Sequence, residues 1–534
     1  MSHESVTLPV RGRLGLPSEL LAALSLFVVY LGLGAYLSIQ KGYLPGDALA
    51  RLASAYLVFH GNQAKLSTIG FVWPPIPTLL IVPFTLLPVL VDSWLAVVIV
   101  SALSMALASV LVGRIALECG VTGFWRWLLV LLFAVNPAMV VFACNGLSEA
   151  VLVAVGLAAF LWLLRFSRTR GNGDLVIAAT LFSLLPLVRY EMVLLTAAVG
   201  LLVGLETWSG SRRDKLARGS SVQGNLIAYS IMAAYPTILW AVASWQIMGS
   251  PIYFLVNDRS ALSVSQIDLG GAEVTLVAAL QLAFNLWTSL FPATALASLV
   301  AIAVGLRRRS AFLIALGLVP LVIPLFQGLL LSRKATVPLV RYYIMAIPLG
   351  YVVSLATVRA LFQNGKRRDA RVFRRALAAL ALLLVASGFA TGMLLASGRY
   401  QDFEHETWLS LTSSERLPDQ RIPETLAVGR RLAELVPPGA TVLLDEYQFG
   451  YAALLGARNP AMFVNHTNPQ YEQALARPWD FVDYVLVPRP EGRGALYAVN
   501  RQYPTLYSEG ASWAVLDDRL PPSAIGWRLY KVRR

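Results

Sequence analysis

Asp47 is the first candidate for chemistry in a chain whose N-terminal 399 residues hold few acids. It comes a few residues after the first long apolar segment, at the start of the stretch Tyr43–Pro88. This stretch continues through Trp73-Pro74-Pro75 into apolar sequence that further prolines interrupt. A carboxylate within hydrogen-bond reach of a hydroxyl group can take its proton during a reaction. We therefore expect a site at the boundary between water and lipid.

Two more acids, Glu149 and Glu191, also lie at predicted membrane boundaries. Glu149 begins an apolar segment, where it either caps a helix or serves as a candidate second acid. Arg189-Tyr190-Glu191 joins two short apolar segments and should lie deeper than an ordinary loop. Arg189 therefore either forms an internal ion pair with Glu149 or Glu191, or lines a cavity and faces a phosphate.

A group of basic residues, Arg333, Lys334 and Arg341, precedes the tenth apolar segment. These side chains could be anchors that reach toward the membrane surface. They could also form an anion site for a lipid phosphate, because the arginine fork donates two hydrogen bonds and is always charged. Arg341, followed by Tyr342, is the best placed of the three.

Composition and charge divide the chain into two parts. The whole sequence is 57% hydrophobic and 14% charged, which indicates an integral membrane protein. Residues 1–399 hold 30 Lys and Arg against 14 Asp and Glu, whereas residues 400–534 hold 14 against 16. The basic residues fall in short clusters between apolar runs, so the formal charge of +14 does not indicate a nucleic-acid partner. We predict a transmembrane domain over 1–399 and a soluble domain over 400–534.

Most of the apolar segments approach the length of about 20 residues that a membrane helix needs. The eleven predicted segments are 20–38, 94–113, 126–143, 148–166, 174–188, 192–206, 225–247, 287–306, 310–331, 342–361 and 375–396. The bias of Lys and Arg between loops predicts a multi-pass protein of the cell membrane with its N-terminus in the cytoplasm. An outer loop over 40–92, carrying Asp47, and the 400–534 domain then lie outside. Ile76–Leu90 should rest on or dip into the membrane, since a full crossing would place the later clusters of Lys and Arg outside the cell.

The C-terminal part has the pattern of a small α/β domain. A helix is expected over Glu424–Leu435, and strands over Thr441–Leu444, Tyr484–Pro488 and Trp527–Val532. Asp445-Glu446 follows the first of these strands, where it is either an ordinary turn or a ligand-binding position at a strand end. Cys119 and Cys144 fall at opposite faces of the membrane and should not pair.

These features together resemble the GT-C superfamily of membrane glycosyltransferases, in particular the protein-mannosyltransferase and aminoarabinose-transferase types. The resemblance is carried by Gly46-Asp47, Trp73-Pro74-Pro75, Asn136-Pro137 with Ser148-Glu149, Arg189-Tyr190-Glu191 and Arg341-Tyr342-Tyr343. It implies a GT-C-like fold of about eleven transmembrane helices with an extracytoplasmic α/β domain. Asp47 has no acidic neighbour in the sequence, whereas some members of the superfamily carry two acids at this position.

The resemblance also implies an activity. Such enzymes transfer a sugar from a polyprenyl-phosphate donor in the membrane to a glycan, lipid or protein acceptor on the extracytoplasmic face, usually with inversion. Asp47 would be the general base or, in some branches, a ligand of a divalent cation such as Mg²⁺ or Mn²⁺. The donor would be bound by basic and aromatic residues, namely Arg341, Lys334, Arg333, Arg189, Tyr342 and Trp73.

Two other functions remain open at the level of the sequence. A transporter or lipid flippase would be expected to show internal repeats with interrupted helices in corresponding halves. A non-catalytic GT-C-like scaffold protein would use Asp47 only to cap the helix that follows it. One long outer loop and a large outer domain agree better with an enzyme than with a transporter.

Overall fold

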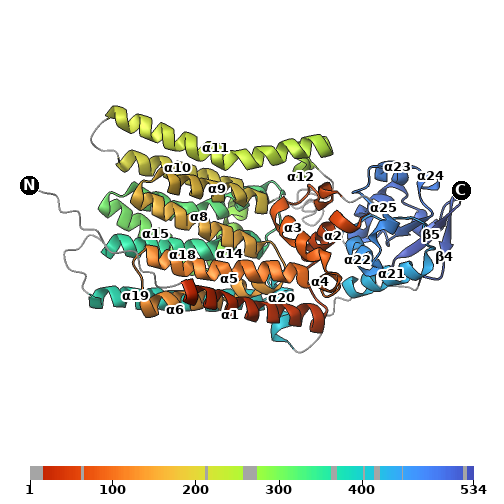
Figure 1. The fold of residues 1–534 in the computed structure, drawn as a ribbon, viewed down its shortest axis with the longest axis horizontal. Helices are drawn as coiled ribbons and strands as arrows, with labels where there is room; N and C mark the ends of the chain where they lie inside the picture. The colour runs from red at the N-terminus through yellow and green to blue at the C-terminus, as the bar shows by residue number, and fades with distance from the viewer. Residues whose placement is uncertain are drawn as a thin grey trace, which may run out of the picture.

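The structure is a computed structural model that describes residues 16–61, 65–210, 215–256, 274–362, 370–400, 403–413, 421–447, 449–520 and 526–533. A long bundle of helices forms most of the molecule, and a small domain containing a β-sheet sits at one end (Figure 1). Residues 257–273 lie outside the described residues.

Eight helical segments of the described residues are long and apolar enough to cross a membrane. They are α1 with η1 (Leu16–Ala35 and Tyr36–Lys41), α5 (Leu95–Glu118), α8 (Glu149–Thr169), α10 (Met192–Gly210), α11 (Lys215–Met248), α16 to α17 (Ala311–Leu318, η4 Val319–Leu321 and Val322–Ser332), η5 with α18 (Val340–Tyr343 and Ala346–Phe362) and α19 (Ala370–Ala396). Two bent helix pairs and the shorter α9 (Asn172–Val188) complete the set. All eleven predicted segments are therefore helical, and the predicted polytopic α-helical fold is confirmed.

The two bent pairs differ from the uninterrupted spans that the sequence predicted. Segment 126–143 is α6 (Gly123–Ala134) and α7 (Pro137–Cys144), which meet at 62°. Segment 287–306 begins at Pro292 instead, because α14 (Leu276–Leu290) and α15 (Pro292–Arg308) meet at 99°. In both pairs a proline occupies the first position of the second helix, where the missing N–H group costs nothing. The same proline cannot continue the preceding helix, because it has no N–H to donate and its ring clashes with the preceding turn.

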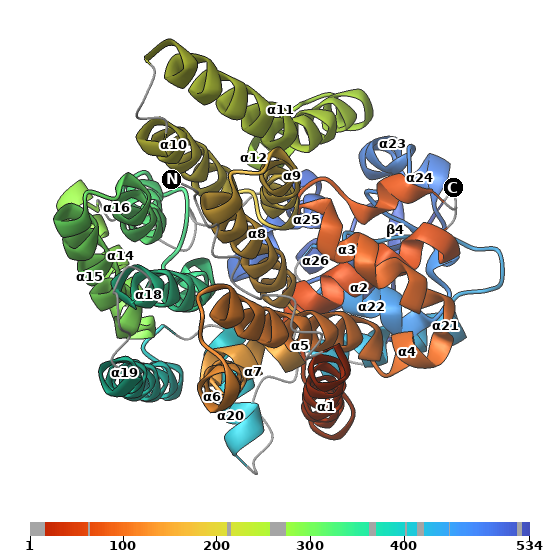
Figure 2. The same ribbon diagram turned by 60° about the vertical axis from the view of Figure 1, so that its left-hand side comes forward.

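The segment between α1 and α5 is a chain of short helices. It contains α2 (Gly46–His60), η2 (Leu66–Ile69), α3 (Pro75–Ile81), η3 (Val82–Leu86) and α4 (Pro88–Asp92). Pro75–Leu86 is one of the shorter apolar helices, below the length of a span. In Figure 2 these helices lie beside the small domain at one end of the bundle.

The C-terminal region begins with α20 (Phe403–Thr412), which packs against α19 and α7 of the bundle. The sheet domain then contains α21 (Arg421–Leu435), α22 (Gly450–Ala457), η6 (Pro460–Met462), α23 (Tyr471–Ala476), α24 (Pro478–Phe481), η7 (Gly492–Leu496), α25 (Ala498–Gln502) and α26 (Leu506–Glu509). Its strands are β1 (Val442–Leu443), β2 (Phe463–Val464), β3 (Tyr484–Val487), β4 (Ala514–Asp517) and β5 (Arg528–Val532), in the order β2-β1-β3-β5-β4. The sequence analysis missed β2 and β4. β1 is parallel to β2 and β3, whereas β5 is antiparallel to β3 and β4.

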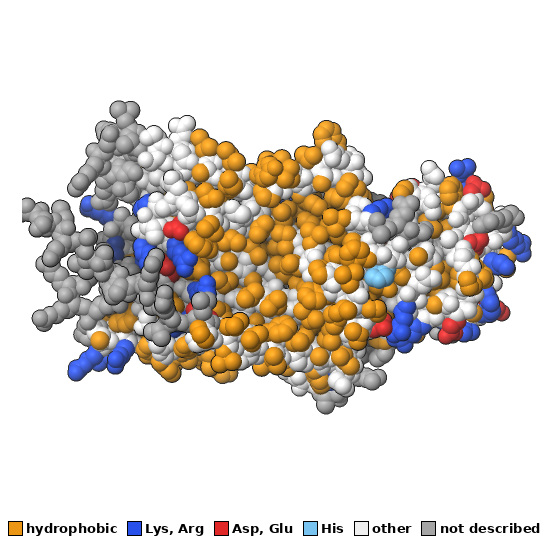
Figure 3. Space-filling view, in the orientation of Figure 1, with side chains coloured by type: hydrophobic (Ala, Val, Ile, Leu, Met, Phe, Trp, Pro, Cys, Tyr) orange, Lys and Arg blue, Asp and Glu red, His pale blue; other side chains and the backbone are white. Residues whose placement is uncertain are grey.

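Charge is concentrated at the ends of the bundle. Figure 3 shows hydrophobic side chains over its middle and Lys and Arg at the end away from the sheet domain. Three acids form ion pairs with arginines at this end: Glu19 with Arg114 and Arg126, Glu118 with Arg165 and Arg168, and Glu206 with Arg170. This is the distribution that a chain crossing a membrane requires, because a charge inside the hydrocarbon is costly.

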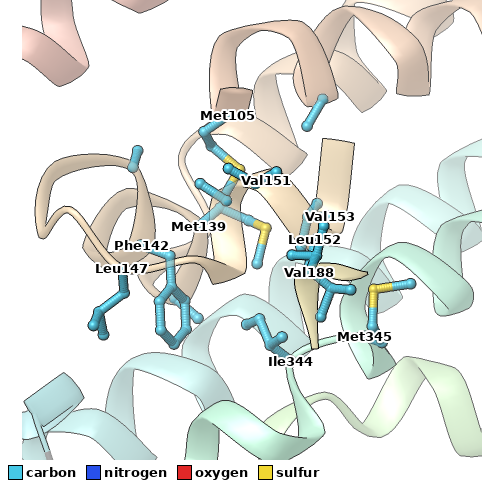
Figure 4. Close-up of a cluster of buried hydrophobic side chains, with 14 of the residues drawn as sticks. Met105, Met139, Phe142, Leu147, Val151, Leu152, Val153, Val188, Ile344 and Met345 are labelled. Carbon is cyan, nitrogen blue, oxygen red and sulfur yellow. The ribbon is translucent and has the colours of Figure 1, made fainter. Parts of the chain in front are cut away.

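A buried apolar cluster lies between α5, α7, α8, the end of α9 and the start of α18 (Figure 4). Leu147, Val188 and Ile344 in this cluster are at most 3% exposed. Each stands within three residues of a predicted site residue, respectively Glu149, Arg189 and Arg341. The cluster therefore holds the backbone at three places from which polar side chains extend. Cys119 and Cys144 are buried and free, as expected from their spacing.

The sheet domain packs on α2 through a close contact at Gly46. A Cβ atom at this position would lie 2.6 Å from the hydroxyl oxygen of Tyr451 in α22. Real Cβ atoms essentially never approach another heavy atom so closely, so only glycine fits without movement of the tyrosine. A side chain at position 46 would thus displace the Tyr451 hydroxyl group from the place where the sheet domain meets the loop.

This contact predicts that Gly46→Ala is destabilising. Overpacking at a well-packed position typically costs about 1–3 kcal/mol, so the apparent Tm of the purified protein should fall. Tyr451→Phe removes the clashing oxygen and should recover part of the loss in the double variant. Gly32→Ala is the matched control, because no atom lies within 4 Å of its added Cβ. Equal melting of Gly46→Ala and the control would contradict the contact.

Candidate active site at the junction of the bundle and the sheet domain

A cavity of about 1940 Å³ lies between the end of the helix bundle and the sheet domain. Its wall includes Asp47 and Arg51 from α2, and Arg189 and Arg341 from the ends of membrane helices. Glu446 and His466 line it from the sheet domain. Segments far apart in the sequence therefore meet around one space, and this space holds the strongest candidates for chemistry.

Asp47 and Arg341 are in direct contact on one wall of this cavity. Asp47 is in the first turn of α2, where the helix dipole favours a negative charge. Its Oδ2 atom lies 2.6 Å from Nη1 of Arg341, and the two side chains are 33% and 13% exposed. Arg341 belongs to the 3₁₀ turn η5, and its guanidinium also lies over the Phe403 ring, 5.4 Å from its centre. The predicted base and the predicted phosphate-binding arginine thus form one ion pair.

Arg189 forms the second cluster of charges on the same wall. Its guanidinium donates to Oε1 of Glu149 and to Oε1 of Glu191. It also lies 5.0 Å from the centre of the Tyr342 ring, which has the Arg341 guanidinium 5.6 Å away. The internal ion pair was one of the two interpretations of Arg189, and it involves both acids. It does not exclude the other interpretation, because Arg189 still lines the cavity.

Glu149 is the most buried acid of the site, with 1% of its side chain exposed. It follows the turn at Asn145-Gly146, in which Gly146 has a φ of +75°. A Cβ atom on Gly146 would meet Val97 at 2.8 Å and Ala48 of α2 at 3.2 Å. A glycine is therefore required here both for the left-handed conformation and for the approach of α2.

Arg51 is a site residue that the sequence analysis did not identify. It lies one helical turn after Asp47, so the two side chains share a face of α2. The Arg51 guanidinium lies 5.1 Å from the centre of the Trp73 ring and donates to the carbonyl oxygen of Pro74 over 3.4 Å. Burial lowers the pKa of Arg51 to about 10, against the opposing effect of Asp47, so it remains charged at neutral pH. The four-residue spacing from Asp47 was the signal in the sequence.

Arg333 and Lys334 are placed differently from the other predicted donor-binding residues. They follow α17 directly, Arg333 is exposed, and neither belongs to the residues that line the cavity. Asp47, Trp73, Glu149, Arg189, Glu191, Arg341 and Tyr342 all line it. The structure thus brings together seven of the nine predicted site residues, and a role for Arg333 and Lys334 in donor binding stays a prediction.

The helix α20 was also missed by the sequence analysis, although it completes the wall. Tyr43 donates a hydrogen bond of 3.0 Å to Oε2 of Glu406, and Lys41 donates one of 2.8 Å to the carbonyl oxygen of Ser413. Burial, reinforced by Glu406, raises the pKa of Tyr43 well above its usual value. These contacts join the end of the first membrane helix to the segment that follows the last one, and Phe403 of α20 supports Arg341.

The residues around Asp47 were also considered as ligands for the divalent cation that the resemblance implies. Among the described residues there is no group of three or more His, Cys, Asp or Glu side chains that could hold a metal ion. The group in contact with Asp47 is the guanidinium of Arg341, which is not a ligand. Mg²⁺ is commonly held by one or two carboxylates together with substrate phosphates. Asp47 together with a donor phosphate would thus be the set that could hold such a cation.

Comparison with known proteins supports the fold. No protein-family model and no curated protein sequence matches the chain. ArnT from Cupriavidus metallidurans bound to undecaprenyl phosphate matches with a TM-score of 0.52 and 14% identity, over 95% of this chain and 97% of that one. ArnT in the apo state matches with 0.51 and 14%, over 96% and 98%. The archaeal oligosaccharyltransferase AglB from Archaeoglobus fulgidus, in complex with an inhibitory peptide and a dolichol-phosphate, has a TM-score of 0.42 and 13% identity, over 96% and 74%. The chain has the fold of ArnT, which confirms the predicted fold class of a polytopic helical membrane domain with a C-terminal α/β domain.

The geometry of the Arg189 cluster predicts a large loss of stability in Arg189→Ala. The change leaves Glu149 buried without its partner, and breaking a buried pair in this way costs about 3–5 kcal/mol. The apparent Tm should fall, and the double variant Arg189→Ala with Glu149→Gln should recover part of it. Arg431→Ala provides the control, because its ion pair with Glu434 is exposed and should be worth little. An Arg189→Ala protein as stable as this control would refute the proposed energetic role.

Proposed function

We propose that this protein is a glycosyltransferase that moves a sugar from a polyprenyl-phosphate donor to the hydroxyl group of an acceptor, with Asp47 as the general base. The contact between Asp47 and Arg341 is the observation that carries the proposal. It places a carboxylate that can take a proton beside a forked cation that can hold a phosphate, at one wall of a cavity where the membrane helices end.

The size of the cavity supports two substrates. Pockets for single small ligands usually measure about 300–1,000 Å³, and this cavity has a volume of about 1940 Å³. It extends from the ends of the membrane helices to the sheet domain. A lipid-linked sugar entering from the membrane and an acceptor entering beside the sheet domain would both find room. The same fold binds undecaprenyl phosphate in ArnT.

The basic residues at the far end of the bundle support the proposed orientation. Because Lys and Arg accumulate on the cytoplasmic side of membrane proteins, the end with Arg114, Arg126 and Arg165 would lie in the cytoplasm. The cavity and the sheet domain would then lie on the extracytoplasmic face. This arrangement agrees with an acceptor that is built or exposed outside the cell.

Donor binding would change the partner of Arg341. In the absence of donor its guanidinium is bound to Asp47, so the two groups neutralise each other. A donor phosphate offers the same guanidinium a second anion, to which two parallel hydrogen bonds can form. Arg341 would turn toward the phosphate and leave the Asp47 carboxylate facing the acceptor. The base would thus become available when the donor has bound.

The proposed reaction is a single displacement. The acceptor oxygen would attack the anomeric carbon of the donor sugar while Asp47 takes the hydroxyl proton. The bond from that carbon to the phosphate oxygen would break at the same time, and the polyprenyl phosphate would leave with its charge stabilised by Arg341 and Arg189. Attack from the face opposite the leaving group inverts the anomeric configuration.

Replacement of Asp47 tests the proposed function directly. Asp47→Asn should lower transfer by about 100- to 10,000-fold, the usual contribution of a general base. It should bind undecaprenyl phosphate at least as tightly as the wild type, because the competing anion beside Arg341 is gone. Arg341→Ala should instead weaken this binding. Transfer is measured by release of the polyprenyl phosphate from a panel of undecaprenyl-phosphate sugars, and binding by the increase in apparent Tm.

Asp92→Asn is the matched control for Asp47→Asn. Asp92 lies in the same loop and pairs with an arginine, Arg458, but this ion pair is exposed and outside the cavity wall. Its replacement should leave transfer unchanged. Undiminished transfer by Asp47→Asn would contradict the role of Asp47 as the general base. It would favour the interpretation of the protein as a transporter or a scaffold protein.

The surroundings of Asp47 also predict the effect of a chelator. Because Asp47 is in contact with the guanidinium of Arg341, which would neutralise the donor phosphate in place of a cation, transfer should continue in EDTA at its original rate. A rate that falls in EDTA and returns with Mg²⁺ or Mn²⁺, but not with Ca²⁺, would show that a cation joins Asp47 and the donor phosphate. The wild-type protein with one undecaprenyl-phosphate sugar suffices for this measurement.

A further inference from the structure

The three parallel strands of the sheet domain all end at the cavity. After β1 the chain continues through Asp445 and Glu446, after β2 through Asn465 and His466, and after β3 through Pro488 and Arg489. Glu446, His466 and Arg489 line the cavity, although they come from three separate strand ends. The carboxyl edge of parallel strands is where open α/β sheets bind ligands. This domain turns that edge toward the proposed active site.

The loop after β1 is held by Asp445. This side chain is 2% exposed, and it accepts hydrogen bonds from the backbone N–H groups of Tyr447 over 3.0 Å and Ala498 over 2.6 Å. An ordinary solvated turn, one of the two interpretations of Asp445-Glu446, does not have this structure. The buried carboxylate ties the β1 loop to the start of α25 and so fixes the residue that follows it, Glu446.

Glu446 and His466 form a pair across two strand ends. Nδ1 of His466 lies 2.7 Å from Oε2 of Glu446, whose side chain is only 9% exposed, while that of His466 is 31% exposed. A carboxylate at Nδ1 orients the ring and leaves Nε2 as the atom that can meet a ligand. An imidazole that donates its Nδ1–H to a carboxylate can accept a hydrogen bond from a hydroxyl group at Nε2.

Aromatic rings adjoin this pair. Tyr447 follows Glu446 and packs edge-to-face on Tyr497, with 5.5 Å between ring centres. Phe449 lies under the guanidinium of Arg421 at 5.1 Å, and all four of these residues line the cavity. At the end of β3, Arg489 lies 3.9 Å from Glu491. This wall thus carries two carboxylates, Glu446 beside His466 and Glu491 beside Arg489.

We propose that these strand ends form the binding site for the acceptor, and that the group bound there is an uncharged, polyhydroxylated ring such as a saccharide. A sugar offers hydroxyl groups, which match the His466–Glu446 pair and Arg489, and an apolar ring face, which matches the tyrosines. A wall on which carboxylates stand beside the cations gives no preference for an anion. The inference rests on the proposed transferase function, because it identifies the second substrate of the same cavity.

The close contact between the two domains sets where this acceptor would lie. Tyr451, in the helix that follows the β1 loop, touches Gly46, the residue before Asp47. A ring held by Glu446 and His466 would stand on the sheet-domain side of the cavity, which the Asp47–Arg341 pair also lines. The sheet domain then selects the acceptor, while the membrane helices bind the donor.

Saturation-transfer NMR on the full-length protein in nanodiscs tests this site without knowledge of the natural acceptor. The probes are methyl α-D-mannopyranoside and methyl β-D-glucopyranoside, with the uncharged peptide acetyl-Gly-Ser-Gly-amide as the other class. At least one saccharide should bind, and His466→Gln and Glu446→Gln should each weaken it about tenfold, the loss expected for a hydrogen bond to a charged or charge-supported group. His60→Gln and Glu434→Gln are the controls, since neither residue lines the cavity.

The possible results separate this inference from the proposed function. The absence of a saccharide signal from the wild type, a signal that both variants retain, or binding of the peptide alone would each overturn the acceptor site. The same titration with Asp47→Asn should retain saccharide binding. If Asp47→Asn keeps full transfer, the proposed catalytic function fails whatever the NMR result. If it loses transfer while His466→Gln and Glu446→Gln bind the saccharide normally, only the acceptor site fails.

Discussion

Charged side chains at the edge of a membrane bundle need partners, and the pairing of Asp47 with Arg341 shows how this protein meets that requirement. An unpaired charge near hydrocarbon is expensive, whereas a pair of opposite charges with further hydrogen bonds is tolerated. The same pairing occurs at Arg189, which neutralises Glu149 and Glu191, and at the far end of the bundle around Glu19. The ends of the helices are thus defined by where their charges can be matched.

On the proposed function, Arg341 exchanges Asp47 for the donor phosphate. The guanidinium could turn toward the phosphate without movement of the backbone. The backbone is held because Ile344 and Met345, just after it, are buried in the apolar cluster between α5, α7 and α8 (Figure 4). A rigid main chain with exchangeable side-chain partners is what a preorganised site requires.

The sheet domain contributes to the site through its topology. Three parallel strands bring their carboxyl ends to one edge, and the contact of Tyr451 with Gly46 holds the domain against α2. On the proposed function, the two halves of the cavity bind substrates of different charge. The membrane half would offer arginines to an anionic lipid, and the sheet half would offer the His466–Glu446 pair and aromatic rings to an uncharged acceptor.

Although it did not show the bends at Pro137 and Pro292, the amino-acid sequence by itself located the apolar helical segments, because hydrophobic length is a local property of the chain. It also identified Asp47, Glu149, Arg189 and Arg341, since polar residues at predicted membrane boundaries are conspicuous in an apolar chain. Only the tertiary structure decided which of these residues meet. The Asp47–Arg341 contact joins positions 294 residues apart, and His466 meets Glu446 through a strand, β2, too short to be recognised. Contacts of this kind depend on how helices and strands pack, and no periodicity in the sequence records that packing.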